Sequence, residues 1–196
     1  MEEVDLSRVP QILLTSVVKL AELNMSNTGL TPQQIMPLWT AIKDNCNFKS
    51  FSMAGTNLAS VDHGTLVRVT RGAYKLGLSN TSLTAEQVTA LVSALDQNQQ
   101  IQEIDLSDNS LAGVDPELLA RVFSRTRRLN LVNTGLTAVQ VTQLLKALTS
   151  AGCHMENLDL SANLLSMIEP DLMAESVNKL KAVTLFDTGL SVNQVL

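Results

Sequence analysis

Aromatic side chains are scarce in this sequence. Its 196 residues include four Phe, one Trp and one Tyr, although 45 % of the residues are apolar. A core made from this chain must therefore be aliphatic, built from Leu, Val, Ile, Met and Ala. Such a composition suits many similar slots filled by branched side chains better than it suits one irregular core.

Long apolar runs are absent as well. No stretch approaches the roughly 18 to 20 residues that cross a bilayer as a helix. Glu2, Glu3 and Asp5 precede the first apolar stretch at residues 12–14, and acidic residues there have the wrong charge for a secretory signal. The sequence therefore predicts no membrane partner, and we expect a cytoplasmic protein.

Few residues are suited to catalysis or metal binding. The two histidines, His63 and His154, lie far apart in the chain, and we find no Gly-rich phosphate loop, G-x-S-x-G, H-E-x-x-H or paired-cysteine metal motif. The neighbours Cys153 and His154 alone are a weak metal signal. We expect no enzyme and no cofactor; an activity lost on changing either histidine would overturn that expectation.

The most informative feature that is present is an internal repeat. One phrase recurs every 53 or 54 residues, at Asn27–Thr31, Asn80–Thr84, Asn133–Thr137 and Asp187–Ser191. A related phrase lies between these copies, at Gly55–Leu58, Asp108–Leu111 and Ala162–Leu165. A period of this kind indicates a solenoid, in which each repeat buries its apolar face only against its neighbours.

Seven strands follow from the pattern L-x-x-L-x-L-x-x-N-x-L, because its alternating centre indicates one buried face. They are predicted near residues 22–26, 50–54, 75–79, 103–107, 128–132, 157–161 and 182–186. Their spacing alternates between 28 or 29 residues and 25 residues. Longer and shorter repeats therefore alternate, in a pattern that resembles the leucine-rich repeat.

Each repeat is predicted to continue into a helix. In the longer repeats a hydroxyl residue and a Gln three positions later form a capping box, at Thr31/Gln34, Thr84/Gln87, Thr137/Gln140 and Ser191/Gln194. In the shorter repeats an acidic cap stands at Asp62, Asp115 and Glu169. The longer helices then present apolar stripes at spacings of three and four, such as Val88, Leu91 and Leu95.

The repeat pattern indicates the fold class, and the direction of curvature follows from a mismatch of widths. Strands stack about 4.8 Å apart, whereas helix axes need about 8 to 10 Å. We therefore expect an α/β fold: a right-handed leucine-rich-repeat solenoid, or horseshoe, with a parallel seven-stranded concave sheet and convex helices. Residues 1–196 form one predicted domain, with a partial N-terminal repeat and its helix at 1–19 and a C-terminal repeat truncated at 196.

The two cysteines are predicted to be free thiols. Cys46 and Cys153 occupy equivalent positions two periods apart, so four strand steps would separate them by roughly 20 Å. A disulfide needs Cα atoms within about 7 Å. Free thiols fit a reducing compartment.

The strand phrase at residues 104–111, a helix in every repeat and the alternation of two repeat types resemble the ribonuclease-inhibitor-like subfamily of leucine-rich repeats. That subfamily includes the repeat domains of NOD-like immune receptors. Threonines stand where this subfamily usually has Asn or Cys, at positions 28, 56, 81, 134 and 188. The resemblance implies protein–protein recognition, with ligand sensing as its more specific form.

The concave face carries mostly small and polar side chains. Residue types that dominate binding interfaces, chiefly Trp, Tyr and Arg, are few near it. The candidate partner-binding residues of this face and its edge are Tyr74, Lys75, Glu103, Asp105, Asp108, Arg127, Arg128, Asn130, Glu156, Asp159 and Phe186.

Charges on this face allow two interpretations. Lys75, Glu103 and Arg128 hold the same position on three successive predicted strands, so opposite charges would alternate about 4.8 Å apart. They form either a cross-strand ladder that fixes which repeat lies beside which, or a mixed-charge docking surface for a protein partner.

A second group of charges is basic and gathers where the shorter helices run into the next strand. Its members are Arg68, Arg71, Arg121, Arg125, Arg127, Arg128, Lys179 and Lys181. Helix C-termini favour cations, which is a structural reason for the group. A net charge of −5 and the lack of stacking aromatics apart from Tyr74 argue against nucleic acid.

The sequence thus predicts a non-catalytic scaffold for protein–protein recognition, in its sharpest form the ligand-sensing repeat domain of a larger innate-immune-type receptor. The alternative is a structural module that self-associates by stacking through uncapped solenoid ends, since unpaired edge strands invite pairing.

Overall fold

The computed structural model describes residues 20–31, 33–36, 39, 48–149 and 154–191. Its strands are β1 (Glu22–Asn24), β2 (Ser50–Ser52), β3 (Lys75–Gly77), β4 (Glu103–Asp105), β5 (Arg128–Asn130), β6 (Asn157–Asp159) and β7 (Ala182–Thr184). Its helices are α3 (His63–Thr70), α4 (Ala85–Gln97), α5 (Pro116–Phe123), α6 (Ala138–Thr149) and α7 (Pro170–Val177).

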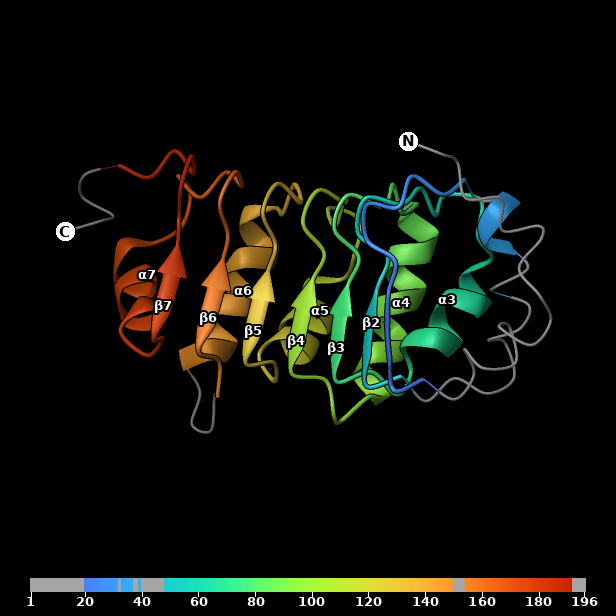
Figure 1. The fold of residues 1–196 in the computed structure, drawn as a ribbon. Coiled ribbons are helices and arrows are strands. Elements are labelled where there is room, and N and C mark those ends of the chain that lie inside the picture. Colours follow the sequence, from blue (N-terminus) through green and yellow to red (C-terminus); the bar gives the residue numbers. More distant parts are fainter. Residues whose placement is uncertain (1–19, 32, 37–38, 40–47, 150–153, 192–196) are drawn as a thin grey trace.

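The strands form one parallel sheet in chain order, β1 to β7. Each strand pairs only with its neighbours in sequence, so the third residues of the strands fall into one column, from Asn24 through Gly77 and Asn130 to Thr184. In Figure 1 the strands lie in front of the helices and each following strand lies to the left. From the helix side each following strand therefore lies to the right, so the crossovers through α3 to α7 are right-handed. The predicted fold class is confirmed.

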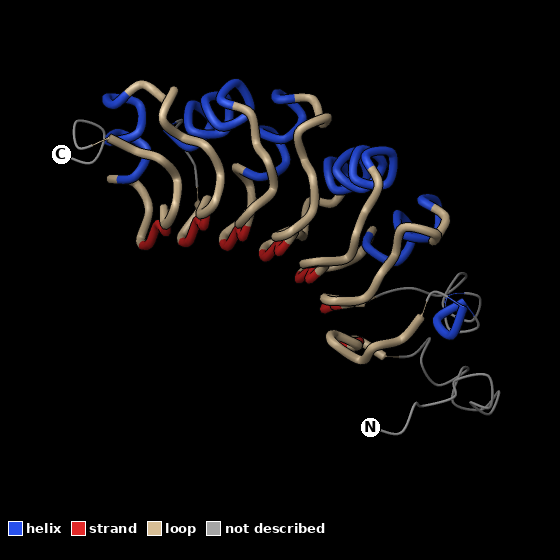
Figure 2. Tube along the Cα trace, turned by 90° about the horizontal axis from the view of Figure 1, so that it is seen from above, coloured by secondary structure: helices blue, strands red, loops and turns tan. Residues whose placement is uncertain are grey.

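The stack is curved, with the sheet on the inner side and the helices on the outer side (Figure 2). This is the arrangement that the difference between strand and helix spacing demands. The concave surface is therefore made of strands alone, while the convex surface is made of α3 to α7.

The strands begin at the predicted residues but are two residues shorter. Backbone pairing continues past the assigned ends, for example from Leu78 N–H to the Asp105 carbonyl oxygen at 2.8 Å and from Asn80 N–H to the Ser107 carbonyl oxygen at 2.8 Å. The chain then turns at a residue with positive φ, which recurs at the same position in all seven repeats: Asn27, Gly55, Asn80, Asp108, Asn133, Ala162 and Asp187. Asn, Asp and Gly tolerate this conformation best, and the turn ends each strand.

The capping boxes form as predicted. Thr84 accepts from Gln87 N–H, and the Gln87 side chain accepts from Thr84 N–H. The pairs Thr31/Gln34 and Thr137/Gln140 make the same two bonds. The fourth box falls on Gln194, outside the described residues.

Two of the three acidic caps behave as predicted. Asp62 and Asp115 each accept from the backbone N–H three residues on, at 2.9 and 2.8 Å. Glu169 occupies the N-cap position of α7 as predicted but makes no side-chain cap bond. The extra methylene of Glu moves its carboxylate away from the helix N–H groups, which is why Asp, Asn, Ser and Thr are the preferred caps.

The core is aliphatic along most of its length. Leu76, Ile104, Leu129 and Leu158, at the centres of successive strands, are at most 3 % exposed. The helical stripe residues Val88, Leu91 and Leu95 are fully buried. Three aromatic residues gather at one end, where the Phe51 ring lies 5.8 Å from that of Trp39 and 5.7 Å from that of Phe48, and Phe123 is buried farther along the core.

Buried amides connect two of the longer repeats to the shorter repeat that follows each of them. Asn109 Oδ1 accepts from Leu83 N–H at 3.2 Å, and its Nδ2 donates to the Leu78 carbonyl oxygen at 2.6 Å. Asn163 makes the equivalent bonds to Leu136 and Leu131. These contacts span 26 to 32 residues of sequence, so they hold adjacent repeats in one register.

Several predictions fall outside the described residues: the helix within 1–19, the state of Cys46 and Cys153, and the helix begun by Ser191. Among the helices that are described, none is long and apolar enough to cross a membrane.

Candidate functional site

The concave sheet forms a shallow hollow of about 450 Å³ that runs from β2 to β7. Its lining consists of strand residues, among them the candidates Lys75, Glu103, Asp105, Arg128, Asn130 and Asp159. The register brings these residues together because they occupy the first and third positions of adjacent strands. The hollow is open and carries charged side chains of both signs.

The third-position side chains mostly accept hydrogen bonds from the residue two positions farther along the sequence. Asp105 accepts from the N–H and hydroxyl of Ser107, at 3.0 and 2.7 Å. Asn130 and Asp159 accept from the N–H two residues on, at 3.1 and 2.9 Å. These groups therefore hold the strand ends in shape, and much of their hydrogen-bonding capacity is already used.

The predicted charge ladder is present on the first-position column. Glu103 lies between Lys75 and Arg128, with N···O distances of 3.1 and 3.0 Å. The three residues pair directly across β3, β4 and β5. All three side chains are partly exposed, so the ladder contributes little to the free energy of folding on its own, but it fixes the positions of two cations at the edge of the hollow.

A second ion pair lies farther along the same edge. Lys181 Nζ is 2.8 Å from Glu156 Oε1. This hydrogen bond, together with the charge of Lys181 and the more distant charges of Arg127 and Arg128, holds the pKa of Glu156 below its ordinary value. Glu156 is therefore ionised at neutral pH.

We call this edge the strand-entry rim: the residue before each strand together with the first residue of that strand, for β2 to β7. Tyr74 and Arg127 belong to it, precede β3 and β5, and are both exposed. Within the part of the chain that the structure describes, neither the Tyr74 hydroxyl nor the Arg127 guanidinium has a hydrogen-bond partner. The structure thus places Tyr74 and Lys75 at the start of β3 and Arg127 and Arg128 at the start of β5, with Glu103 of β4 between them.

Two candidates lie elsewhere. Asp108 follows β4 on the opposite edge of the sheet, where it adopts a φ of 57° and accepts from Asn133 Nδ2 at 2.9 Å. Phe186 follows β7 at the far end of the sheet and is 79 % exposed. The eleven candidates therefore do not form one site; most line the hollow and its entry rim.

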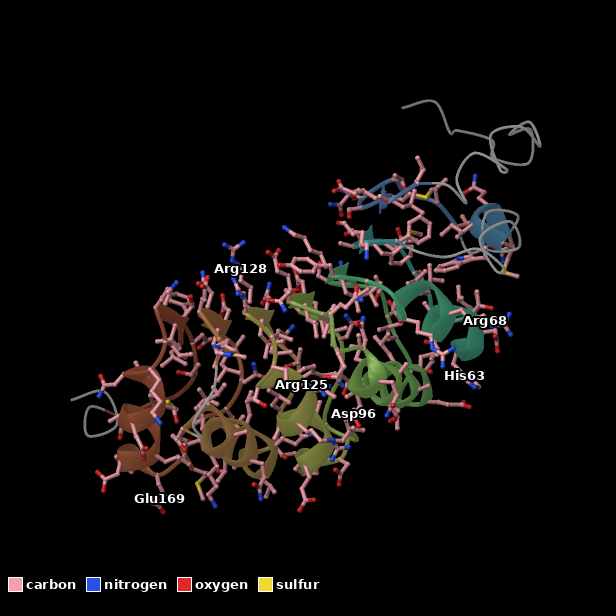
Figure 3. The ribbon with its side chains drawn as sticks, turned by 90° about the horizontal axis from the view of Figure 1, so that it is seen from below. His63, Arg68, Asp96, Arg125, Arg128 and Glu169 are labelled. Atoms are coloured by element: carbon pink, nitrogen blue, oxygen red, sulfur yellow. The ribbon has the colours of Figure 1, made fainter. Side chains whose placement is uncertain are left out.

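The basic group divides into paired and unpaired members. Asp96, at the end of α4, binds Arg121 through two hydrogen bonds of 3.0 Å and lies 3.4 Å from Arg125 (Figure 3). The Arg121 hydrogen bonds and the charges of both arginines hold the pKa of Asp96 below its ordinary value. Two members of the basic group are therefore paired with Asp96, an acidic residue that sequence reasoning did not single out.

The histidines show no catalytic arrangement. His63 begins α3 and its Nδ1 lies 3.6 Å from Glu86 Oε1, with both side chains well exposed. His154 is exposed ahead of β6. Within the described ranges, no three His, Cys, Asp or Glu side chains are grouped so that they could hold a metal ion.

Comparison with known proteins supports the repeat assignment. The family model described as "Leucine Rich Repeat" matches residues 100–122. The chain is also 30 % identical over 154 residues to NACHT, LRR and PYD domains-containing protein 5 of Bos taurus. The chain is built of leucine-rich repeats.

The similarity covers unequal parts of the two proteins. It spans 74 % of this leucine-rich-repeat protein but 14 % of the bovine one. A leucine-rich-repeat protein of Leptospira interrogans also resembles it at 12 % identity, over 93 % of this chain and 70 % of that chain, with a TM-score of 0.29. Membership of the ribonuclease-inhibitor-like subfamily stays a prediction.

Proposed function

We propose that this leucine-rich-repeat protein is a non-catalytic scaffold that binds another protein on the concave face of its sheet. The observation that carries the proposal is the continuous hollow from β2 to β7, lined by regularly spaced polar and charged side chains. Such a surface suits a macromolecular partner better than a small molecule, because the hollow is open whereas small-molecule sites bury most of their ligand.

In its more specific form, the protein is the ligand-sensing repeat domain of a larger cytoplasmic receptor of the innate-immune type. The similarity to the bovine protein, whose name includes NACHT, LRR and PYD domains, supports this form. So does the size of the match, because this chain corresponds to a small part of that protein. The whole receptor's activity then depends on what the concave face binds.

Site-specific photocrosslinking in the source cells tests the proposal. A photoreactive amino acid replaces Asn157, which is exposed in the hollow, and a matched variant carries it at Ser93, which is exposed on convex α4. We expect a discrete protein adduct from position 157 and none from position 93. Equal labelling from both positions, or adducts from position 93 alone, would refute the concave face as the binding surface.

Self-assembly through the solenoid ends is the second candidate. In the described sheet β1 and β7 are paired on one side only, and the central residue of each, Leu23 or Val183, is less buried than the equivalents in β2 to β6. Light scattering compares the chain with a version extended by a polar repeat. A dimer that disappears on capping would favour assembly over recognition.

A further inference from the structure

Charge is distributed unequally between the two edges of the sheet. From the third residue of each strand to the following helix cap, the described chain contains seven acidic residues and no Lys, Arg or His: Asp62, Asp105, Asp108, Asp115, Asp159, Glu169 and Asp187. The strand-entry rim instead carries Lys49, Lys75, Arg127, Arg128 and Lys181 beside Glu103 and Glu156. The molecule is therefore polarised along the strand direction.

Most carboxylates of the acidic edge already accept hydrogen bonds from other groups of the protein. Asp62 and Asp115 cap helices, Asp105 and Asp159 hold the strand ends, and Asp108 accepts from Asn133. Five of its seven carboxylates therefore already accept hydrogen bonds. A basic partner would have to displace those bonds to reach them.

The strand-entry rim keeps positive charge that is not paired within the described part of the protein. Glu103 forms ion pairs with both Lys75 and Arg128, so the three residues together carry one excess positive charge. Arg127 adds a full charge with no hydrogen-bond partner among the described residues, and the Tyr74 hydroxyl is likewise unpaired. Parallel pairing puts Tyr74 and Arg127 two strands apart, at roughly 10 Å.

From this asymmetry we propose that the strand-entry rim across β3 to β5 is a docking site for an acidic segment of a partner protein. Arg127 and Arg128 supply charge-assisted hydrogen bonds to carboxylates of that segment, Lys75 supplies a further cation, and Tyr74 supplies an amphipathic surface. Tyr and Arg are the residue types that dominate binding energy at protein interfaces. The inference rests on the proposed function and specifies the chemistry of the partner.

The surroundings favour a protein segment over nucleic acid. Glu103 lies in the middle of the rim, and Asp105 and Asp159 line the hollow beside it, so a continuous phosphate backbone would meet repulsion. Tyr74 is the one aromatic residue on the described rim, whereas single-stranded nucleic acids are bound by several stacking rings. A segment with a few spaced carboxylates avoids both problems.

Fluorescence anisotropy with the 196-residue chain tests the proposal. The probe is a fluorescein-labelled twelve-residue peptide in which Glu alternates with Ser; its counterpart has Gln in place of every Glu, and a thymidine twelve-mer serves as the nucleic-acid probe. We expect saturable binding of the Glu peptide at low salt, weaker binding at physiological salt, and no saturable binding of the Gln peptide. Tighter binding of the oligonucleotide, or equal binding of both peptides, would overturn the proposal.

A matched pair of variants localises the site. Arg127→Gln removes one exposed cation from the rim, and Arg68→Gln removes one from α3 on the helix side, away from Arg128 and the rim (Figure 3). Arg127→Gln should weaken binding of the Glu peptide by about tenfold, as loss of a charge-assisted hydrogen bond implies. Arg68→Gln should leave the affinity within about twofold. Equal losses in both variants would indicate unspecific attraction and would refute a rim site.

Failure here can be told apart from failure of the proposed function. If photocrosslinks form at position 157 but the Glu peptide does not bind, the scaffold role stands and the acidic-segment chemistry is wrong. If position 157 gives no crosslink, the scaffold role itself fails.

Discussion

Asn109 and Thr81 form a buried contact that joins two repeats. Asn109 Oδ1 accepts from Thr81 N–H at 3.3 Å and lies 3.2 Å from the Thr81 hydroxyl, which is also 2.8 Å from the Leu78 carbonyl oxygen. Asn163 and Thr134 repeat the contact one period later. Two of the threonines that depart from the resembled pattern, Thr81 and Thr134, therefore have a partner in the next repeat.

Removing this amide should be severely destabilising. Asn109→Ala leaves Thr81 N–H and Leu83 N–H without their buried acceptor and removes one of the two side-chain donors to the Leu78 carbonyl oxygen. Each such loss costs about 1 to 3 kcal/mol, so we expect the free energy of unfolding in urea to fall by about 3 to 5 kcal/mol. Asn157→Ala, at an exposed strand position, is the control and should change it by less than about 0.5 kcal/mol. Similar values for the two variants would contradict the contact.

The equivalent threonine of the first short repeat should behave differently. Thr56 occupies the Asn109 position, and its buried hydroxyl lacks a hydrogen-bond partner among the described residues. Thr56→Val should therefore be neutral or stabilising by up to about 1 kcal/mol, since an unsatisfied polar group is removed. Thr81→Val removes a bonded hydroxyl and should cost about 1 to 2 kcal/mol. Thermal unfolding of both variants measures these changes in stability. A larger loss of stability for Thr56→Val than for Thr81→Val would contradict the finding that the Thr56 hydroxyl lacks a partner within the described part of the chain.

The pairing of Asp96 with Arg121 predicts in which direction the stability of the protein changes with pH. Its folded-state pKa lies below the ordinary value of 3.8, chiefly because Arg121 hydrogen-bonds to it. Its contribution to stability is therefore present in full above the unfolded pKa and is lost as pH falls through the lowered folded pKa. Wild type should be more stable than Asp96→Asn by a constant amount from about pH 5 to 7. Urea titrations should show that margin shrinking below the ordinary value of 3.8; a margin that grows on acidification would contradict the pairing.

Substitutions of two neighbouring residues at the end of β4 should lower the free energy of unfolding by different amounts. Leu106 is fully buried, and Leu106→Ala should lower the free energy of unfolding by about 2 to 5 kcal/mol. Asp105 points into the hollow, and Asp105→Ala should cost about 1 kcal/mol for its bonds to Ser107. Equal costs in denaturant unfolding would mean that the strand faces are reversed.

The strands, their order and their register could be predicted because the Leu-x-Leu pattern repeats at regular intervals. Residues at equivalent positions of successive repeats therefore align across the sheet, as Lys75, Glu103 and Arg128 do. The short-range capping boxes could be predicted for the same reason, since Thr84 and Gln87 meet within one turn.

Contacts that depend on lateral placement could not be predicted. Asp96 meets Arg121 and Arg125 only because the ends of α4 and α5 lie at one level, which the repeat length does not specify. The sequence indicated that Asp105 points outward, but not that its carboxylate accepts from Ser107, because that bond depends on how the chain leaves the strand. Gln87 likewise donates to the Leu58 and Val61 carbonyl oxygens of the preceding repeat, beyond the reach of a local capping argument.

Engineered disulfides test most directly whether adjacent repeats share one register, on which every column of charge described above depends. In a chain with Cys46 and Cys153 changed to Ser, Cys replaces either Lys75 and Glu103, which are direct partners, or Lys75 and Asp105, which are offset by two residues. Partners across adjacent strands are about 4.8 Å apart and the offset pair about 8 Å, against a limit of about 7 Å for a disulfide. We predict that mild oxidation crosslinks the 75/103 pair and leaves the 75/105 pair reduced on mass analysis; the opposite result would contradict the register.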